Sequence, residues 1–138
     1  MTRIALNGLG RIGKLALRDL IDTGAGGEIV LLNDPVGDAE QHALLMEFDS
    51  VHGRWKTPVS YGEAGLNLNG QPIRLTHERT IEALPLRDLG VDLVIDLNGV
   101  KGFNQVTLDR TDFKGTGVMK YQLKTANNTA TKSMIIVE

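Results

Sequence analysis

The sequence contains no cysteine, which excludes several kinds of chemistry at once. The chain can form no disulfide, it has no thiolate to bind a metal, and it offers no cysteine nucleophile. Its histidines and acidic residues also show no cluster with the spacing of metal ligands. We therefore predict no metal site, and the missing nucleophile bears directly on the function considered below.

The sequence also lacks an excess of basic charge and any long apolar run. Its 15 basic and 17 acidic residues are mixed along the chain, which gives a net charge of -2 and no basic stripe for nucleic acid. No apolar run approaches the length of a membrane span, and Met1-Thr2-Arg3 leads straight into a strand instead of the core of a signal peptide. We expect a cytoplasmic protein without nucleic-acid or membrane partners.

What is present in residues 1–96 is an alternation of strands and helices. Arg3 to Asn7 is a short apolar strand, and Glu28 to Asp34 is a second strand with too few polar residues for a solvent-exposed face, as in a parallel sheet. Between them the pattern predicts a helix from Leu9 to Thr23, ended by Gly24. Four apolar residues recur at helical spacing and are expected to face the core: Ile12, Leu15, Ala16 and Leu20.

A second helix is predicted over residues 39–48, with Asp38 as its N-cap. Its expected core residues are Ala39, Leu44, Leu45 and Phe48. Alternating apolar residues around 62–65 and around Asn69-Gly70 then predict hairpin turns. A short helical piece leads into a further buried strand, Val91 to Asp96. This order is half of a doubly wound sheet with a hairpin excursion.

The turn after the first strand carries three glycines at the spacing of a dinucleotide-binding motif. Gly8 makes the tight turn, Gly10 lets the backbone approach a pyrophosphate, and Gly13 lets the helix pack on the strand. Asp34 stands at the end of the second strand, where such a fold places the carboxylate that binds the ribose hydroxyls. A carboxylate there would repel a 2'-phosphate, which favours NAD over NADP. The alternative is that Asp34-Pro35 only starts a turn and the glycines only pack a helix on a strand.

Four segments of residues 1–96 resemble one enzyme family in order and spacing: "NGLGRIGKLALR", "VLLNDPVGDAEQHALLMEFDSVHGRW", "LNLNGQPIRLTHER" and "LPLRDLGVDLVID". The resemblance is to the amino-terminal half of phosphorylating glyceraldehyde-3-phosphate dehydrogenase or the related erythrose-4-phosphate dehydrogenase. It implies NAD bound by the Gly8 to Gly13 turn, with the backbone of Arg11 and Ile12 near the pyrophosphate, Asp34 on the ribose and Arg79 beside the adenine. It also implies that residues 49–54 form a loop near the cofactor and a subunit contact.

The chain departs from that family after residue 96. The family continues with cysteine or serine, threonine and glycine, whereas this chain has Leu97, Asn98 and Gly99. The catalytic cysteine and the general-base histidine of the family have no counterpart here. His42 falls in the second predicted helix, His52 and His77 lie where the family has no general base, and a histidine without an orienting partner is usually structural. We predict no catalytic residue and no activity for the chain alone.

Residues 97–138 change to period-two alternation with turn-rich separators, which predicts an antiparallel meander. The segments "DLNG", "KGFNQVTLDR", "YQLKT" and "TATKSM" resemble the last strands of the carboxy-terminal sorting domain of type IX secretion cargo. The chain is therefore interpreted as a chimera joined near Asp96 to Gly102. The fold class is α/β, a truncated Rossmann-like parallel sheet (residues 1–96) extended by a C-terminal antiparallel tail (residues 97–138).

The junction leaves two arrangements for the tail. Asn98-Gly99 suits a tight hairpin turn, so the tail can fold back beside Val91 to Asp96 and continue the sheet antiparallel. Alternatively, two chains exchange strands or pair their edges in a homodimer.

Three functions are compatible with these observations. The chain is a nucleotide-binding module that keeps the adenosine and pyrophosphate site for NAD or ADP-ribose, a structural chimera without ligand, or an enzyme subunit completed by another chain.

Overall fold

The computed structural model describes residues 1–24, 27–97, 117–124 and 129–136. The elements follow one another as β1 (Arg3–Asn7), α1 (Arg11–Thr23), β2 (Glu28–Asn33), α2 (Ala39–Glu47), β3 (Phe48–Asp49), β4 (Gly53–Arg54), β5 (Val59–Gly62), β6 (Gly65–Leu68), β7 (Gln71–Thr76), the 3-10 helix η1 (Ile81–Ala83), β8 (Leu93–Asp96), β9 (Gly117–Lys124) and β10 (Thr129–Ile136). The predicted strands and helices of the first 96 residues are thereby confirmed, with ends that differ by one or two residues at most elements.

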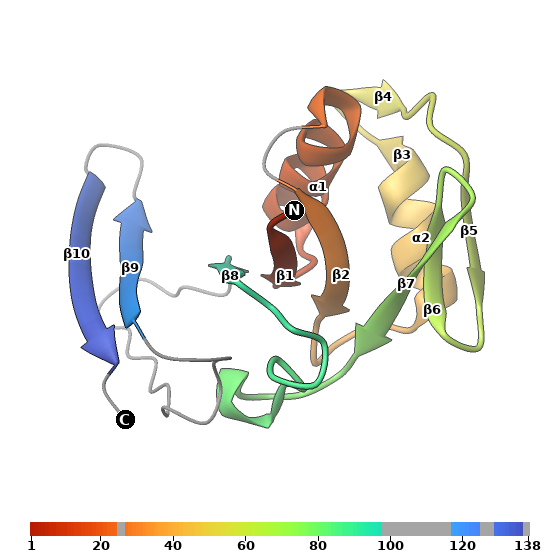
Figure 1. Ribbon diagram of the computed structural model, residues 1–138. Coiled ribbons are helices and arrows are strands. Elements are labelled where there is room, and N and C mark those ends of the chain that lie inside the picture. The colour runs from red at the N-terminus through yellow and green to blue at the C-terminus, as the bar shows by residue number, and fades with distance from the viewer. Residues whose placement is uncertain (25–26, 98–116, 125–128, 137–138) are drawn as a thin grey trace.

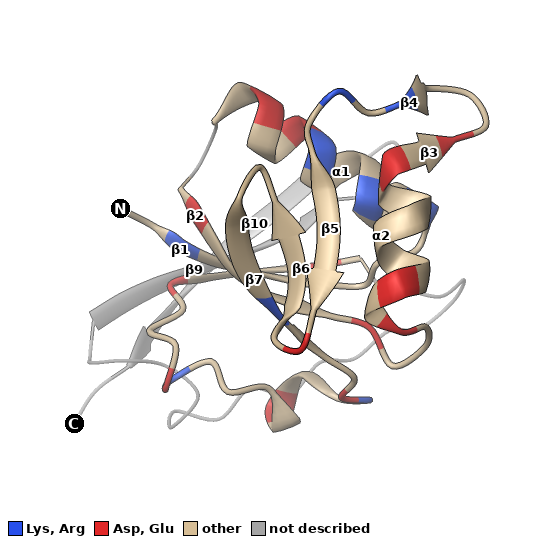
Figure 2. Cartoon of the chain, turned by 90° about the vertical axis from the view of Figure 1, so that its right-hand side faces the viewer, with Lys and Arg blue, Asp and Glu red and all other residues tan. Residues whose placement is uncertain are grey.

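The main sheet has six strands in the order β5-β6-β7-β2-β1-β8 (Figure 1). β7, β2, β1 and β8 are parallel neighbours, whereas β5, β6 and β7 form an antiparallel meander at one side. α2 runs alongside β5 at that side, as Figure 2 shows. The predicted class, an α/β Rossmann-like fold with a mostly parallel sheet, is confirmed.

The sheet is covered on both faces because residues along β1 and β2 alternate between two cores. Ile4 and Leu6 of β1 and Leu32 of β2 pack on the larger core, which includes residues of α1 and α2. Ala5 and Leu31 face the opposite core, which η1 and the segment after it complete. Burial on both faces explains why β2 has almost no polar residue along its length.

The ends of the two helices follow local sequence signals. Asp38 caps α2 through a capping box: its side chain accepts a hydrogen bond from the Gln41 backbone N–H at 2.8 Å, and the Gln41 side chain accepts one from the Asp38 backbone N–H at 3.2 Å. Gly24, in the left-handed conformation, ends α1. Both predicted helix boundaries are confirmed, as is the hairpin turn between β6 and β7 at Asn69-Gly70.

The predicted buried face of α1 is wrong in part. Ile12 is 67% exposed, and Leu15, Ala16 and Leu20 are only half-buried. The helix instead buries Gly13, Lys14, Leu17 and Arg18. The physical reason is that both buried cations find carbonyl oxygens: Lys14 donates to the Leu9 carbonyl, and the Arg18 Nε donates to the Met46 carbonyl at 2.8 Å.

The predicted core residues of α2 are also wrong in part. Leu44, Leu45 and Phe48 are 57%, 56% and 49% exposed, and Ala39 is half-buried. The buried residues are His42, Ala43 and Met46, and Met46 lies on the same face as the other two because it follows them by four and three positions. His42 takes the core position because both of its ring nitrogens have hydrogen-bond partners there.

The strand predicted from Val91 to Asp96 is shorter and less buried than expected. β8 begins at Leu93, which is 42% exposed, and its two central residues are half-buried. β8 pairs with β1 and stands last in the sheet order of the described strands.

The antiparallel character predicted for the tail is confirmed for β9 and β10. They pair with each other from Gly117↔Ile136 to Lys124↔Thr129. Within the described backbone they form a sheet of their own and do not extend the six-stranded sheet. The strand predicted at residues 100–110 and the turn predicted at Asn98-Gly99 lie outside the described residues. No helix among the described residues is long and apolar enough to cross a membrane.

Candidate functional site

The turn between β1 and α1 brings the backbones of two elements into close approach at the carboxyl edge of the sheet. The Gly8 N–H donates to the Asn33 carbonyl at the end of β2 at 2.8 Å, and Gly8 has φ +104°, which favours glycine. A Cβ atom at Gly13 would lie 1.9 Å from the Gly8 carbonyl oxygen. No side chain fits at Gly13, so α1 approaches β1 as closely as backbone allows.

The start of α1 is open to a ligand. Gly10 is its N-cap, and no side chain caps the helix or places a carboxylate in its first turn. A Cβ atom at Gly10 would meet nothing within 4 Å. Free amide groups at a helix N-terminus attract anions, because the helix dipole is positive there. The site can therefore hold a phosphate group against the backbone of Arg11 and Ile12.

Asp34 lies directly against this turn. Its Oδ2 accepts a hydrogen bond from the Leu9 N–H at 2.7 Å, and its Oδ1 accepts one from the Val36 N–H at 2.9 Å. The second bond makes Asp34 the start of a turn, as the alternative interpretation of the sequence held. The first brings the carboxylate to the glycine turn, as the cofactor interpretation requires. Each carboxylate oxygen keeps a further lone pair that can accept from a ribose hydroxyl.

The sequence reasoning missed a buried network of side chains beneath the site. Asn33 Nδ2 donates to Asn7 Oδ1 at 2.7 Å and to the Glu78 carbonyl at 3.0 Å. The Thr76 hydroxyl and the Glu78 N–H both donate to Asn33 Oδ1, at 2.7 and 2.8 Å. Asn7 Nδ2 continues the network to Asp96 Oδ1 at 3.1 Å. The signal in the sequence is that each of two neighbouring apolar strands ends in asparagine.

This network also fixes where Arg79 lies. Arg79 follows Glu78, whose backbone is held on both sides by the Asn33 amide, so the chain after β7 passes the end of β2. Arg79 itself is exposed. The structure thus brings Gly8, Gly10, Gly13 and Asp34 together, with Arg79 at the neighbouring strand end.

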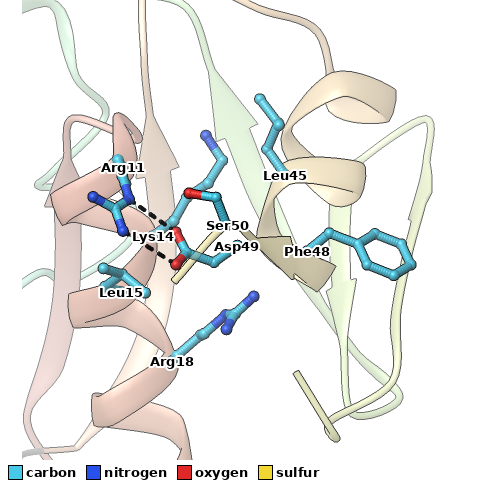
Figure 3. Close-up of a pocket in the computed structure, with 8 residues that line it drawn as sticks. All are labelled: Arg11, Lys14, Leu15, Arg18, Leu45, Phe48, Asp49 and Ser50. Carbon is cyan, nitrogen blue, oxygen red and sulfur yellow. Dashed lines mark hydrogen bonds and ion pairs between the residues drawn. The ribbon is translucent and has the colours of Figure 1, made fainter. Parts of the chain in front are cut away.

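The Arg11 side chain leans away from the glycine turn toward β3. Its guanidinium pairs with Asp49, with Nε 3.0 Å from Oδ2, as Figure 3 shows. Asp49 also accepts from the backbone N–H groups of Val51 and His52. The hydrogen bond from Arg11, followed by these backbone bonds, holds the pKa of the Asp49 carboxyl well below its usual range. Only the backbone of Arg11 is therefore positioned for a pyrophosphate.

A groove of about 260 Å³ opens between α1 and the end of α2 (Figure 3). Its lining consists of Arg11, Lys14, Leu15, Arg18, Leu45, Phe48, Asp49 and Ser50. Its cations all have partners: Arg11 has Asp49, while Lys14 and Arg18 bond to carbonyl oxygens. The groove lies beside the glycine turn, and Asp34 is not among its lining residues.

Each of the three histidine rings has a polar partner within hydrogen-bond distance. His42 is buried beside Lys14, His52 Nδ1 lies 3.1 Å from Asp49 Oδ1, and His77 Nδ1 lies 3.0 Å from the Asp34 carbonyl. Acidic and basic residues are interspersed around α1, α2 and β3 in Figure 2. Within the ranges that the structure describes, no three His, Asp or Glu residues come together in a way that could hold a metal ion.

A comparison with protein families finds a match over residues 2–103 to the family model described as glyceraldehyde 3-phosphate dehydrogenase, NAD binding domain. The matched residues include the glycine turn, Asp34, Arg79 and the whole six-stranded sheet. This match ends seven residues later than the resemblance described from the sequence, which ended at Asp96.

Proposed function

We propose, since this chain belongs to the family of the NAD-binding domain of glyceraldehyde 3-phosphate dehydrogenase, that it binds NAD through the adenosine and pyrophosphate half and catalyses no reaction alone. The observation that carries the proposal is the glycine turn. Gly8 has a positive φ of 104°, and Gly13 leaves no room for a Cβ atom, whereas Gly10 faces open space at an uncapped helix N-terminus.

The residues present fit the adenosine and pyrophosphate half of NAD. The amide groups of Arg11 and Ile12 would hold the pyrophosphate, Asp34 would accept hydrogen bonds from the ribose hydroxyls, and Arg79 would lie beside the adenine. When bound, NAD would supply a nicotinamide ring that accepts hydride. The Asp34 carboxylate would repel a 2'-phosphate, so NADP would bind more weakly than NAD.

The absence of catalysis follows from the side chains available. The sequence has no cysteine to form a covalent intermediate. Burial holds His42 neutral, since it lowers the pKa of the ring, and Lys14 beside it acts in the same direction. His52 is exposed on the connection between β3 and β4, where its Nδ1 lies 3.1 Å from Asp49 Oδ1. The two other candidate functions, a ligand-free structural chimera and a subunit completed by another chain, predict different binding results.

Isothermal titration of the full chain with NAD, ADP-ribose and NADP tests the proposal. We expect NAD and ADP-ribose to bind with similar affinity and NADP to bind more weakly. Absence of heat with all three, from a protein that unfolds cooperatively, would support the structural chimera instead. NAD reduction that appears only after mixing with a dehydrogenase would support the subunit completed by another chain.

A pair of glycine variants makes the test specific for the turn. Gly10→Ala adds a methyl group in the open space where the pyrophosphate would approach, and we expect it to weaken ADP-ribose binding by about tenfold or more. Gly62→Ala in β5 is the matched control, because its Cβ would also meet nothing within 4 Å but lies at the hairpin side of the sheet. Equal affinity of the two variants would contradict the assignment.

The proposal extends to the tail and to assembly. We propose further that the chain is a chimera joined near Asp96 to Gly102, with the family match reaching residue 103, and that β8 pairs with a second copy. Leu93 in β8 and Leu97 directly after it are 42% and 37% exposed. The exposed leucines support the pairing with a second copy, and among the described strands β9 and β10 form a sheet apart from the six-stranded one. Size-exclusion chromatography with light scattering tests the dimer, and a monomer over a wide concentration range would exclude it. A cytoplasmic location remains part of the same proposal.

A further inference from the structure

Two titratable side chains are buried beneath the glycine turn, where the proposed function does not use them. Lys14 of α1 is 6% exposed and His42 of α2 is 5% exposed. The backbone of Gly37 covers the imidazole, because a Cβ atom there would lie 2.8 Å from His42 Nε2. A buried lysine is costly unless its hydrogen bonds are made, so its partners are informative.

The partners of the Lys14–His42 pair define the state of the imidazole. Lys14 Nζ lies 3.0 Å from His42 Nδ1, and His42 Nε2 lies 2.8 Å from the Val36 carbonyl oxygen. A carbonyl oxygen only accepts, so Nε2 carries the proton and donates. Nδ1 is then the acceptor for the Lys14 ammonium group. A neutral imidazole satisfies every one of these contacts, whereas an imidazolium has no acceptor to offer Lys14.

The same ammonium group reaches the glycine turn. Lys14 Nζ donates to the carbonyl oxygen of Leu9, the residue between Gly8 and Gly10. The Leu9 N–H donates to Asp34 Oδ2 at 2.7 Å. The central residue of the turn is thus held at its carbonyl by α1 and at its amide by the end of β2. Rotation of the peptide groups on either side of Leu9 would change the direction in which the N–H groups at the start of α1 point.

We infer that Lys14 is a positioning residue for nucleotide binding, which holds the glycine turn through the Leu9 carbonyl, and that neutral His42 keeps Lys14 in place. This inference rests on the proposed function for its binding consequence. Protonation of His42 sets two cations against each other within the pair and removes the acceptor for Lys14. The turn is then released, and nucleotide affinity falls in acid.

The direction of the pH dependence follows from all the groups around His42. Lys14 faces it from α1, Asp34 from the end of β2 and His77 from the segment after β7. Burial lowers the pKa of His42, and Lys14 lowers it further, against the opposing effects of the Val36 carbonyl and Asp34. Folding therefore favours the unprotonated ring. The arrangement is complete above the ordinary histidine pKa of about 6.5 and is lost as the pH falls through the lowered value.

Titration calorimetry of the full chain with ADP-ribose, repeated from about pH 8 to about pH 5, tests the inference. Lys14→Met keeps the aliphatic stem without the ammonium group, and we expect about tenfold weaker binding, or about 1.4 kcal/mol, at neutral pH. His42→Asn keeps an acceptor near the Nδ1 position and has no proton to gain, so we expect it to flatten the pH dependence. Lys56→Met, an exposed lysine, is the charge-matched control.

A nucleotide-free readout separates this inference from the proposed function. NMR of the full chain reports the tautomer and titration of His42, and hydrogen exchange reports protection of the Leu9 amide. We expect the Nε2–H tautomer and protection that is lost as His42 titrates. If no nucleotide binds but Leu9 protection follows His42, the proposed function fails and the positioning role stands.

The opposite result overturns the inference and leaves the proposed function standing. In that case Lys14→Met, His42→Asn and the unaltered chain would bind nucleotide with the same affinity and the same pH profile. If Lys14→Met does not fold, Lys14→Arg, which retains a donor, and His42→Asn supply the comparison. Unaltered pH dependence in His42→Asn would then reject the role of the pair.

Discussion

Two of the glycine-bearing turns among the described residues differ in how their backbones are held. At the turn between β6 and β7, Asn69 and Gly70 have φ values of 55° and 80°, and a Cβ atom at Gly70 would meet nothing within 4 Å. At the turn between β1 and α1, a Cβ atom at Gly13 would lie 1.9 Å from the Gly8 carbonyl oxygen. The first turn depends on its own dihedral angles, and the second depends on what surrounds it.

The difference shows how far the conformation of each turn depends on contacts with distant parts of the chain. The hairpin turn closes between Leu68 and Gln71, which are three positions apart and pair directly. The glycine turn is held by the Asn33 carbonyl and the Asp34 carboxylate at the end of β2, and by Lys14 of α1. A turn held from several elements keeps one conformation, which a phosphate-binding backbone needs. We therefore expect substitutions at the glycine turn to cost more stability and to change binding as well.

The largest expected effect is that of Gly13→Ala. The added methyl group would overlap the Gly8 carbonyl group, so α1 must move away from β1, and we expect the free energy of unfolding to fall by about 3 kcal/mol. Urea unfolding followed by circular dichroism measures this loss, with Gly62→Ala as the control for the substitution itself. Unfolding of Gly13→Ala at the same urea concentration as the unaltered chain would contradict the close approach of α1 and β1.

A smaller loss is expected from Asn33→Leu, which keeps the approximate volume but removes the amide. The Thr76 hydroxyl, the Glu78 N–H and Asn7 Oδ1 would each lose a buried partner, and we expect a loss of about 2 kcal/mol. Asn67→Leu, at a half-buried site in β6, is the matched control. Equal unfolding midpoints for the two variants would show that the network does not stabilise the sheet edge.

The smallest of these effects is expected at the hairpin, from Gly70→Ala. The methyl group has space, so the cost is that of a left-handed conformation alone, about 1 kcal/mol. Gly70→Asn should recover part of it, because asparagine tolerates this region. Nucleotide affinity should stay unchanged in both, measured by the same titration. An affinity change would mean that the two turns are coupled.

Local signals in the sequence predicted the order of elements and the ends of several of them. The capping residue Asp38, the helix end at Gly24 and the turn at Asn69-Gly70 each act within a few residues, so a single segment contains the information. The three glycines and Asp34 were found in the same way, from spacing that reflects one turn and one strand end.

The buried faces of the helices could not be predicted from periodicity alone. Lys14 and Arg18 occupy core positions because carbonyl oxygens of Leu9 and Met46 accept their protons, and the second of these lies far along the chain. Leu44 and Leu45 stay exposed since His42 has partners in the core and takes the buried face. Hydrogen bonds between distant elements determine which face of a helix is buried. The spacing of hydrophobic residues carries no information about those bonds.

The single tryptophan is a fluorescent probe of the structure at the far end of α1. Trp55 is 7% exposed, its indole N–H donates to Asp22 at 2.9 Å, and the Arg18 guanidinium lies 5.8 Å from the centre of its ring. Asp22 lies eleven positions after Arg11, so about 16 Å of helix separates this fluorophore from the start of α1. Its emission should therefore report the unfolding of the domain while remaining insensitive to whatever occupies the glycine turn.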